Sequence, residues 1–141
     1  MNQVSTDKTS YSETRLRVRY AETDQMGVVY HANYFVWFEV GRVEYCRQRG
    51  ISYRDLEQQQ AVYMAVSEAR CRFISPARYD DEIIVRTSLG RLRRRSLTFN
   101  YDVIRAADDV LLAEGETVHI FLNSDSRPRT LPPHVARSLQ G

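Results

Sequence analysis

The stretch best equipped for chemistry is "AETDQMGVVYHANYFVWFEVGR", residues 21–42. It places Asp24 and Gly27 in a loop that leads, through His31, into a long apolar and aromatic block. A carboxylate can act as a nucleophile or a general base, and a helix N-terminus offers unpaired N–H groups that stabilise a developing oxyanion. An acid held opposite the start of a helix is therefore sufficient for attack on an activated carbonyl carbon.

Each residue of this stretch also has a purely structural interpretation. Asp24 can cap the helix or close an Asx turn. Gly27 can be an ordinary turn glycine as well as a place where the backbone approaches a substrate closely. The His31 ring can cap the helix or bind a neighbour, so its backbone N–H is the better candidate for substrate contact. Glu22 is expected to be solvated.

The second feature able to serve a ligand is the run "RLRRRS", residues 91–96. Arginine clusters match phosphate groups, although such a run is also typical of a solvated hairpin. Of the 20 basic residues 19 are arginine, with Lys8 the only lysine, and a GC-rich genome gives the same bias without any function. The net charge of +2 is too small to indicate nucleic-acid binding.

Length and cysteine content bound the remaining possibilities. The 141 residues suit one domain with one core, and Cys46 and Cys71 form neither a zinc-ligand spacing nor a disulfide framework, which favours a reducing compartment. Residues 1–14 lack the apolar middle of a signal peptide, and no apolar run reaches the ~18 residues of a membrane span. We expect a cytoplasmic protein with a flexible segment at residues 1–14, one domain at residues 15–141, and neither cofactor nor metal.

Apolar periodicity predicts a strand, one long helix and then four more strands. Residues 15–20 alternate strictly, which places Leu16, Val18 and Tyr20 on an inward face. Residues 32–49 form the helix, whose first half is apolar nearly all round, as in a helix enclosed by other structure. The later elements are a helical turn capped by Ser52, strands at residues 61–73, 82–89, 96–104 and 110–122, and a short helix after Pro132–Pro133. A bulge is expected near Ser67–Glu68 in the first of these strands, and Gly115 is a candidate for a second bulge in the last.

This order of elements limits the architecture. Without further long helices the sheet cannot be a parallel α/β sheet, so an α+β fold with a five-stranded antiparallel sheet is expected. One helix can cover only one face of such a sheet. We therefore expect a homo-oligomer in which a partner covers the other face and the edges.

Residues 17–45, "RVRYAETDQMGVVYHANYFVWFEVGRVEY", resemble the acyl-CoA thioesterases of the 4-hydroxybenzoyl-CoA thioesterase type. The likeness continues through "SPARYDDEI", residues 75–83, and the basic hairpin. The acid–x–x–Gly–x–Val–aromatic–His–x–Asn–Tyr pattern is long and specific. The resemblance implies the hotdog fold, in which a long central helix is wrapped by a five-stranded antiparallel sheet, and assembly as a dimer or a dimer of dimers (a homotetramer).

The same resemblance implies the reaction and the roles of residues. The reaction is hydrolysis of an acyl-CoA thioester to a carboxylic acid and coenzyme A, with the acyl group left open. Asp24 stands at the position of the catalytic carboxylate, as nucleophile or as general base. Tyr20 and His31 match the tyrosine and histidine proposed to assist it, although an inward place on the strand favours packing for Tyr20, and the His31 N–H would polarise the carbonyl. The substrate-binding candidates are Gly27, Val29, Tyr30 and Tyr34, together with Arg93, Arg94 and Arg95, whose hairpin would meet the phosphates of coenzyme A.

Other functions are less compatible with the residues. A serine thioesterase needs G-x-S-x-G, which does not occur. Hotdog hydratases carry proline soon after the acid and histidine five residues after it, whereas this chain has no proline there and has Val29 at that position. A non-catalytic acyl-CoA-binding protein stays open as an alternative, as does a divergent hydratase or dehydratase. Neither a nucleic-acid partner nor a membrane span is expected.

Overall fold

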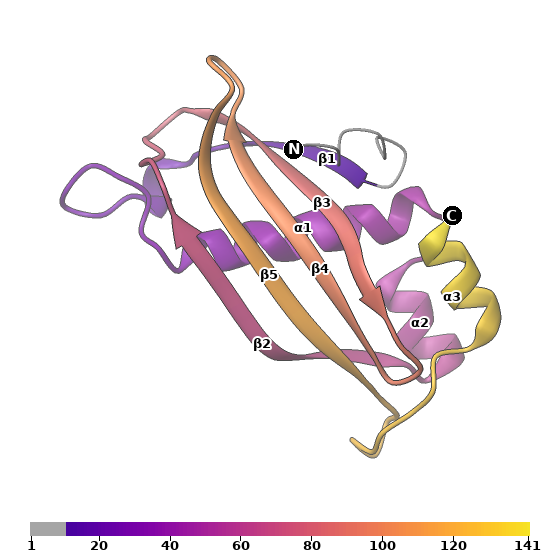
Figure 1. Cartoon of the computed structure of the whole chain (residues 1–141). Helices are drawn as coiled ribbons and strands as arrows, with labels where there is room; N and C mark the ends of the chain where they lie inside the picture. The colour runs from indigo at the N-terminus through magenta and orange to yellow at the C-terminus, as the bar shows by residue number, and fades with distance from the viewer. Residues whose placement is uncertain (1–10) are drawn as a thin grey trace.

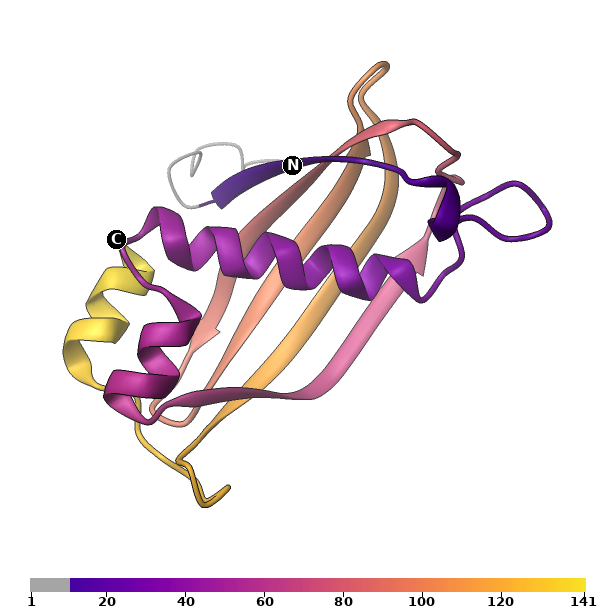
Figure 2. The same ribbon diagram turned by 180° about the vertical axis from the view of Figure 1, so that it is seen from behind.

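The computed structural model describes residues 11–141. A long helix lies across one face of a curved sheet, and two short helices sit together at one end of it (Figures 1 and 2). The predicted α+β arrangement, a long central helix wrapped by a five-stranded antiparallel sheet, is confirmed, with a second helix directly after the first. The elements in chain order are β1 (Tyr11–Arg17), the 3-10 helix η2 (Tyr20–Glu22), α1 (Asn33–Gln48), α2 (Tyr53–Gln60), β2 (Tyr63–Phe73), β3 (Glu82–Leu92), β4 (Ser96–Arg105), β5 (Val110–Leu122) and α3 (Pro133–Gln140).

The strands follow the order β1-β3-β4-β5-β2, and every pairing is antiparallel. The register of β2 against β5 shifts between Val66 and Glu68, which confirms the bulge predicted near Ser67–Glu68. The period-two alternation of β3 and β4 is also confirmed, because every second side chain faces α1 and is buried. This buried set is Ile83, Val85, Thr87, Leu97, Phe99, Tyr101 and Val103.

Gly115 on β5 allows α1 to approach the sheet. It pairs regularly with Cys71 and Tyr101, so the second bulge considered there is wrong, and the register of β4 against β5 shifts instead between Val103 and Ile104. A Cβ at Gly115 would lie 2.2 Å from the fully buried ring of Phe38. The glycine is needed because an aromatic ring occupies the space of its missing side chain.

The start of the chain differs from the prediction in two ways. β1 begins at Tyr11, so residues 11–14, expected to be flexible, form a strand paired with β3; residues 1–10 of that expected segment lie outside the described residues. Residues 11–14 are mostly polar and show no apolar alternation, so the sequence pattern does not predict a strand there. Backbone pairing with β3 holds this strand in place. β1 also ends at Arg17, so Tyr20 is not on an inward strand face but in η2, where it is 76% exposed.

The outer face of the sheet is largely polar and pairs its own charges. The cross-strand pairs are Arg70 with Glu116, Arg72 with Glu114 at 2.7 Å, and Arg86 with Glu13 at 2.8 Å. Exposed pairs of this kind contribute only ~0.2–1 kcal/mol each. They do not decide whether a partner covers this face, so the expected homo-oligomer stays a prediction. The edge strand β2, where Val66 and Phe73 are exposed, is suited to pairing with a second copy.

A buried polar chain crosses the inner face of the sheet. The Tyr101 hydroxyl and Thr117 Oγ1 lie 2.6 Å apart, and Thr117 Oγ1 lies 2.8 Å from Nε2 of the fully buried His119. Burial, reinforced by the positive charge of Arg42, lowers the pKa of His119 to about 4. The ring is therefore neutral in the folded protein at neutral pH.

His119 should make the protein sensitive to acid. Below pH 6.5 the unfolded chain protonates this ring while the folded protein does not until about pH 4, so stability is complete above pH 6.5 and is lost as the pH falls toward 4. We expect a loss on the order of 2 kcal/mol between pH 6.5 and 4.5. Urea unfolding of the wild type and His119→Gln at several pH values measures it, with the variant losing less over that range. Parallel pH profiles of the two proteins would contradict the assignment.

Candidate active site

Asp24 lies in a tight loop between η2 and α1. Its backbone N–H donates to the Val28 carbonyl at 2.9 Å, and Gly27 N–H donates to the Asp24 carbonyl at 3.0 Å. Asp24 Oδ1 accepts the Met26 N–H at 2.9 Å, which is an Asx turn. Gly27 has φ +80°, a backbone conformation that glycine adopts without strain. The turn fixes the direction of a half-buried carboxylate that keeps its second oxygen available.

Backbone bonds on both sides hold this loop to the sheet. Val29 N–H donates to the Ala77 carbonyl at 2.8 Å, and Val28 forms an isolated bridge with Arg78. Ala77 and Arg78 belong to the connection between β2 and β3. The loop of Asp24 is thereby placed against the end of β2.

The two residues just before α1, His31 and Ala32, supply unpaired backbone donors. Helical bonding starts with the N–H of Asn33 to the Tyr30 carbonyl and of Tyr34 to the His31 carbonyl. Among the bonds of residues 11–141, none has the N–H of His31 or Ala32 as its donor, and Ala32 caps the helix without a side-chain bond. Both residues are exposed. These N–H groups, at the positive end of the helix dipole, suit an anionic or polarised oxygen.

Asp24 and the start of α1 border the same cleft, which has a volume of about 360 Å³. Its inner wall is aromatic: Tyr34, 3% exposed, meets Phe73 edge to face at 5.1 Å, and the His31 ring lies 6.2 Å from Phe73. Burial raises the pKa of Tyr34, so its hydroxyl stays protonated. The residues that line the cleft are Asp24, Val28, Val29, His31, Tyr34, Phe73, Ile74, Ser75 and Pro76.

The structure brings together four of the residues singled out from sequence, Asp24, Val29, His31 and Tyr34, and leaves others outside. Gly27 shapes the turn but does not line the cleft. Two further residues also lie outside its lining: the exposed Tyr30 ring packs against His31 at 4.4 Å, and the Tyr20 ring packs edge to face on Tyr79 at 5.6 Å.

Two parts of the site were missed from sequence. The wall formed by the end of β2 and residues 74–76 received no role, although the family likeness included residues 75–83. Phe73, the last residue of β2, belongs to this wall and is 48% exposed at the cleft. Glu22, expected to be solvated, is 5% exposed and bonded to α1. The alternation of apolar residues gives no signal for a buried carboxylate.

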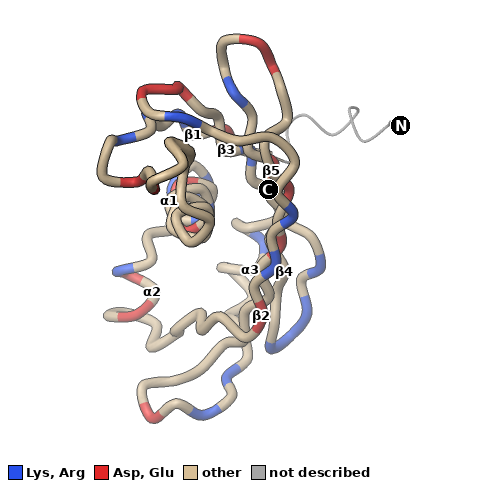
Figure 3. Tube along the Cα trace, turned by 90° about the vertical axis from the view of Figure 1, so that its left-hand side faces the viewer, with Lys and Arg blue, Asp and Glu red and all other residues tan. Residues whose placement is uncertain are grey.

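The arginine run forms the hairpin between β3 and β4, far from Asp24 in the same chain. Figure 1 shows the loop before α1 and this hairpin at opposite ends of the sheet, and Figure 3 shows the hairpin as a continuous blue stretch. The cleft lies near the start of β3, and the 11 residues of that strand span roughly 30 Å. Arg93, Arg94 and Arg95 are exposed and, with Ser96, border a separate shallow hollow.

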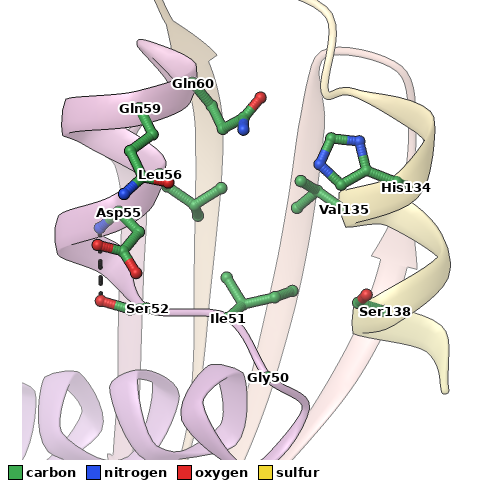
Figure 4. Close-up of a pocket in the computed structure, with 10 residues that line it drawn as sticks. All are labelled: Gly50, Ile51, Ser52, Asp55, Leu56, Gln59, Gln60, His134, Val135 and Ser138. Carbon is green, nitrogen blue, oxygen red and sulfur yellow. Dashed lines mark hydrogen bonds between the residues drawn. The ribbon is translucent and has the colours of Figure 1, made fainter.

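A second pocket, of about 200 Å³, lies between α2 and α3 (Figure 4). Its lining includes Asp55, whose backbone N–H donates to Ser52 Oγ at 3.4 Å, and His134 on the facing helix. Within residues 11–141 no cluster of His, Cys, Asp and Glu could hold a metal ion. The acid in this pocket, Asp55, lies in the first turn of α2, whose start Ser52 already caps.

A long helix enclosed by a five-stranded antiparallel sheet, with an acid-lined cleft at the helix start, is the arrangement of the hotdog-fold thioesterases. The sequence profile of the thioesterase-like superfamily matches residues 18–139 of the chain. The chain belongs to this superfamily. In the described part of the chain, no helix is both long and apolar enough to pass through a bilayer.

Similar proteins agree with this assignment. The acyl-CoA thioester hydrolase YbgC of Escherichia coli is 31% identical over 121 residues, which cover 85% of this chain and 89% of YbgC. The DHNA-CoA thioesterase of Staphylococcus aureus is 32% identical, with a TM-score of 0.86 and coverage of 91% of this chain and 87% of that one. A 4-hydroxybenzoyl-CoA thioesterase, solved in complex with 4-hydroxybenzoyl-CoA, shares the fold with a TM-score of 0.86. It is 19% identical, and the match covers 94% of this chain and 99% of that one. The family resemblance found in the sequence is confirmed.

Proposed function

We propose that the protein hydrolyses acyl-CoA thioesters to a free carboxylic acid and coenzyme A. The observation that carries this proposal is that the Asp24 carboxylate and the unpaired N–H groups at the start of α1 border one cleft. Thioester hydrolysis needs an attacking oxygen and a stabilised oxyanion, and the cleft has a group for each. The names of YbgC and the Staphylococcus aureus enzyme support coenzyme A thioesters as the substrate class.

In the proposed reaction the thioester carbonyl oxygen points at the N–H groups of His31 and Ala32. Asp24 either attacks the carbonyl carbon and forms an acyl-enzyme anhydride, which water then hydrolyses, or removes a proton from a water that attacks directly. The C–S bond breaks and the sulfur leaves as a thiolate, which is stable because thiols of this kind have a pKa near ~8.5. No strong general acid is required, so the His31 ring and Tyr20 have at most an assisting role.

The substrate would lie across the cleft with its acyl group against Tyr34 and Phe73. The nucleotide end of coenzyme A would extend out of the cleft. The arginine run of the same chain lies at the other end of the sheet and so is not placed to meet it. We propose that the hairpin of a second copy provides Arg93, Arg94 and Arg95, in a homodimer or a dimer of such dimers. The exposed edge of β2 beside Phe73 supports such an assembly. Light scattering that gives the monomer mass at assay concentration would contradict this part of the proposal.

The arginine hairpin should act on substrate binding and not on the chemical step. We expect Arg93→Ala, Arg94→Ala and Arg95→Ala to raise KM for an acyl-CoA about threefold to tenfold with little change in kcat, since each contact to phosphate contributes about 1 kcal/mol. The same acyl group on pantetheine, which lacks the nucleotide, is the control, because wild type and variants should then have equal KM. Unchanged KM for acyl-CoA in all three variants would make the hairpin ordinary solvated surface.

The test of the proposed function is release of free thiol from a panel of acyl-CoAs with aromatic, short-chain and long-chain acyl groups. Turnover of at least one of them, lost on substitution of Asp24, is expected. Tight binding of acyl-CoA without thiol release would favour a non-catalytic binding protein. Hydration of an enoyl-CoA without thiol release would favour a hydratase.

A further inference from the structure

A second carboxylate, Glu22, lies two residues before Asp24 and is buried. It ends η2 and is 5% exposed, whereas Asp24 faces the cleft. Glu22 does not line the cleft, so it is not placed to touch substrate. A buried carboxylate is stable only where hydrogen bonds replace its water, which makes its partners informative.

The two carboxylate oxygens of Glu22 bind donors on both sides of the loop. Oε1 accepts the backbone N–H of Arg19 at 2.8 Å, at the start of η2. Oε2 accepts the indole N–H of Trp37, which lies one turn into α1, at 3.0 Å. The exposed guanidinium of Arg19 adds a longer contact of 3.4 Å to Oε2. The side chain thus joins the segment before Asp24 directly to the helix.

The main-chain carbonyl of Glu22 makes a matching pair of bonds. It accepts the backbone N–H of Tyr30 at 2.9 Å and the side-chain amide of Asn33 at 2.9 Å. Tyr30 is the last residue before the unpaired N–H groups, and Asn33 is the first residue of α1. One residue therefore links both ends of the Asp24 loop to the first turn of the helix.

We propose, on the basis of the proposed function, that Glu22 is a positioning residue that fixes the Asp24 carboxylate relative to the oxyanion-binding start of α1. Asp24 follows Glu22 by two residues, and the donor groups of His31 and Ala32 lie between its partners Tyr30 and Asn33. No other described side chain bonds to both segments through its carboxylate. Displacement by about 1 Å can lower a rate by roughly a hundredfold, so such a clamp affects the chemical step more than substrate binding.

The first test is the kinetics of Glu22→Gln. An amide offers one accepting oxygen where the carboxylate offers two, so either Arg19 or Trp37 loses its acceptor. We expect kcat to fall about tenfold to a hundredfold and KM to stay within about threefold, measured well below the unfolding temperature. Trp37→Phe removes the donor of the hydrogen bond between Trp37 and Glu22. The double variant Glu22→Gln/Trp37→Phe should therefore have a kcat no lower than that of the slower single variant.

The second readout does not depend on activity. Trp37 is the only tryptophan, so the indole N–H gives one resonance in a proton–nitrogen NMR spectrum. In the wild type this proton should exchange slowly with solvent, and in Glu22→Gln the resonance should shift and exchange at least about tenfold faster, because the hydrogen bond that protects it is weakened. Glu39→Gln is the matched control, since Glu39 lies exposed on α1 and its substitution should change neither the indole signal nor kcat.

The outcomes separate this proposal from the proposed function. A shifted indole signal with kcat within twofold of the wild type would overturn the positioning role and leave Glu22 as a structural residue. An unmoved indole signal would overturn the clamp itself, with or without activity. A wild type that releases thiol from no acyl-CoA defeats the proposed function, and the NMR result still decides whether Glu22 holds the loop to α1.

Discussion

Replacing Asp24 by asparagine is expected to lower kcat for acyl-CoA hydrolysis by about 10²- to 10⁴-fold, the usual size of the contribution of a catalytic acid or base. Asparagine keeps the side-chain oxygen that accepts the Met26 N–H, so the turn should survive. Only the negative charge is lost, and with it the ability to attack the carbonyl or to deprotonate water. Thiol release under steady-state conditions measures the effect, alongside circular dichroism to verify folding.

Two further variants make this result specific. Asp109→Asn makes the same chemical change in the exposed turn between β4 and β5, where the positive φ of 58° suits asparagine, and it should leave kcat unchanged. His31→Ala removes the ring but keeps the backbone N–H, so a smaller loss than in Asp24→Asn is expected. Equal activity of Asp24→Asn and the wild type would remove the basis of the proposed mechanism.

Replacing Gly115 by valine is expected to destabilise the protein by about 3 kcal/mol or more, by overpacking of the core. A Cβ at this position meets the Phe38 ring at 2.2 and 2.4 Å and the Arg70 carbonyl at 3.0 Å. The ring cannot easily move, since it stacks on Tyr101 at 4.2 Å with an angle of 9° between the planes. Thermal unfolding should show Tm lower by roughly 10 °C.

The cause of this effect can be checked by a compensating change. Phe38→Leu removes the atoms that meet the new side chain, so the double variant should be less destabilised than the sum of the two single variants. Gly90→Ala provides the control, because its Cβ would first meet the end of the Asn100 side chain, which can turn away at an exposed site. Additive losses in the Gly115 and Phe38 variants would show that the ring is not the obstacle.

The spacing of apolar residues along the chain predicted most of the helices and strands of this fold. The period-two segments of β3, β4 and β5 and the apolar helix at residues 33–48 are visible in the chain itself, since each must present one apolar face or stripe to a common core. The bulge near Ser67–Glu68 followed from a change of phase in the same alternation. The Asp24 motif likewise identified the acid and the helix start by their separation along the chain.

What only the tertiary structure decided concerns groups that meet across the fold. Glu22 is a buried clamp because Trp37 and Tyr30 come to it from other segments, and residues 11–14 form a strand because β3 lies beside them. Phe73 forms a wall of the cleft because β2 ends there, and the arginine hairpin lies far from Asp24 because β3 carries it to the other end of the sheet. A sequence pattern reports which side chains avoid water, whereas hydrogen bonds and cleft walls depend on which segments become neighbours, and that is set only when the whole chain packs.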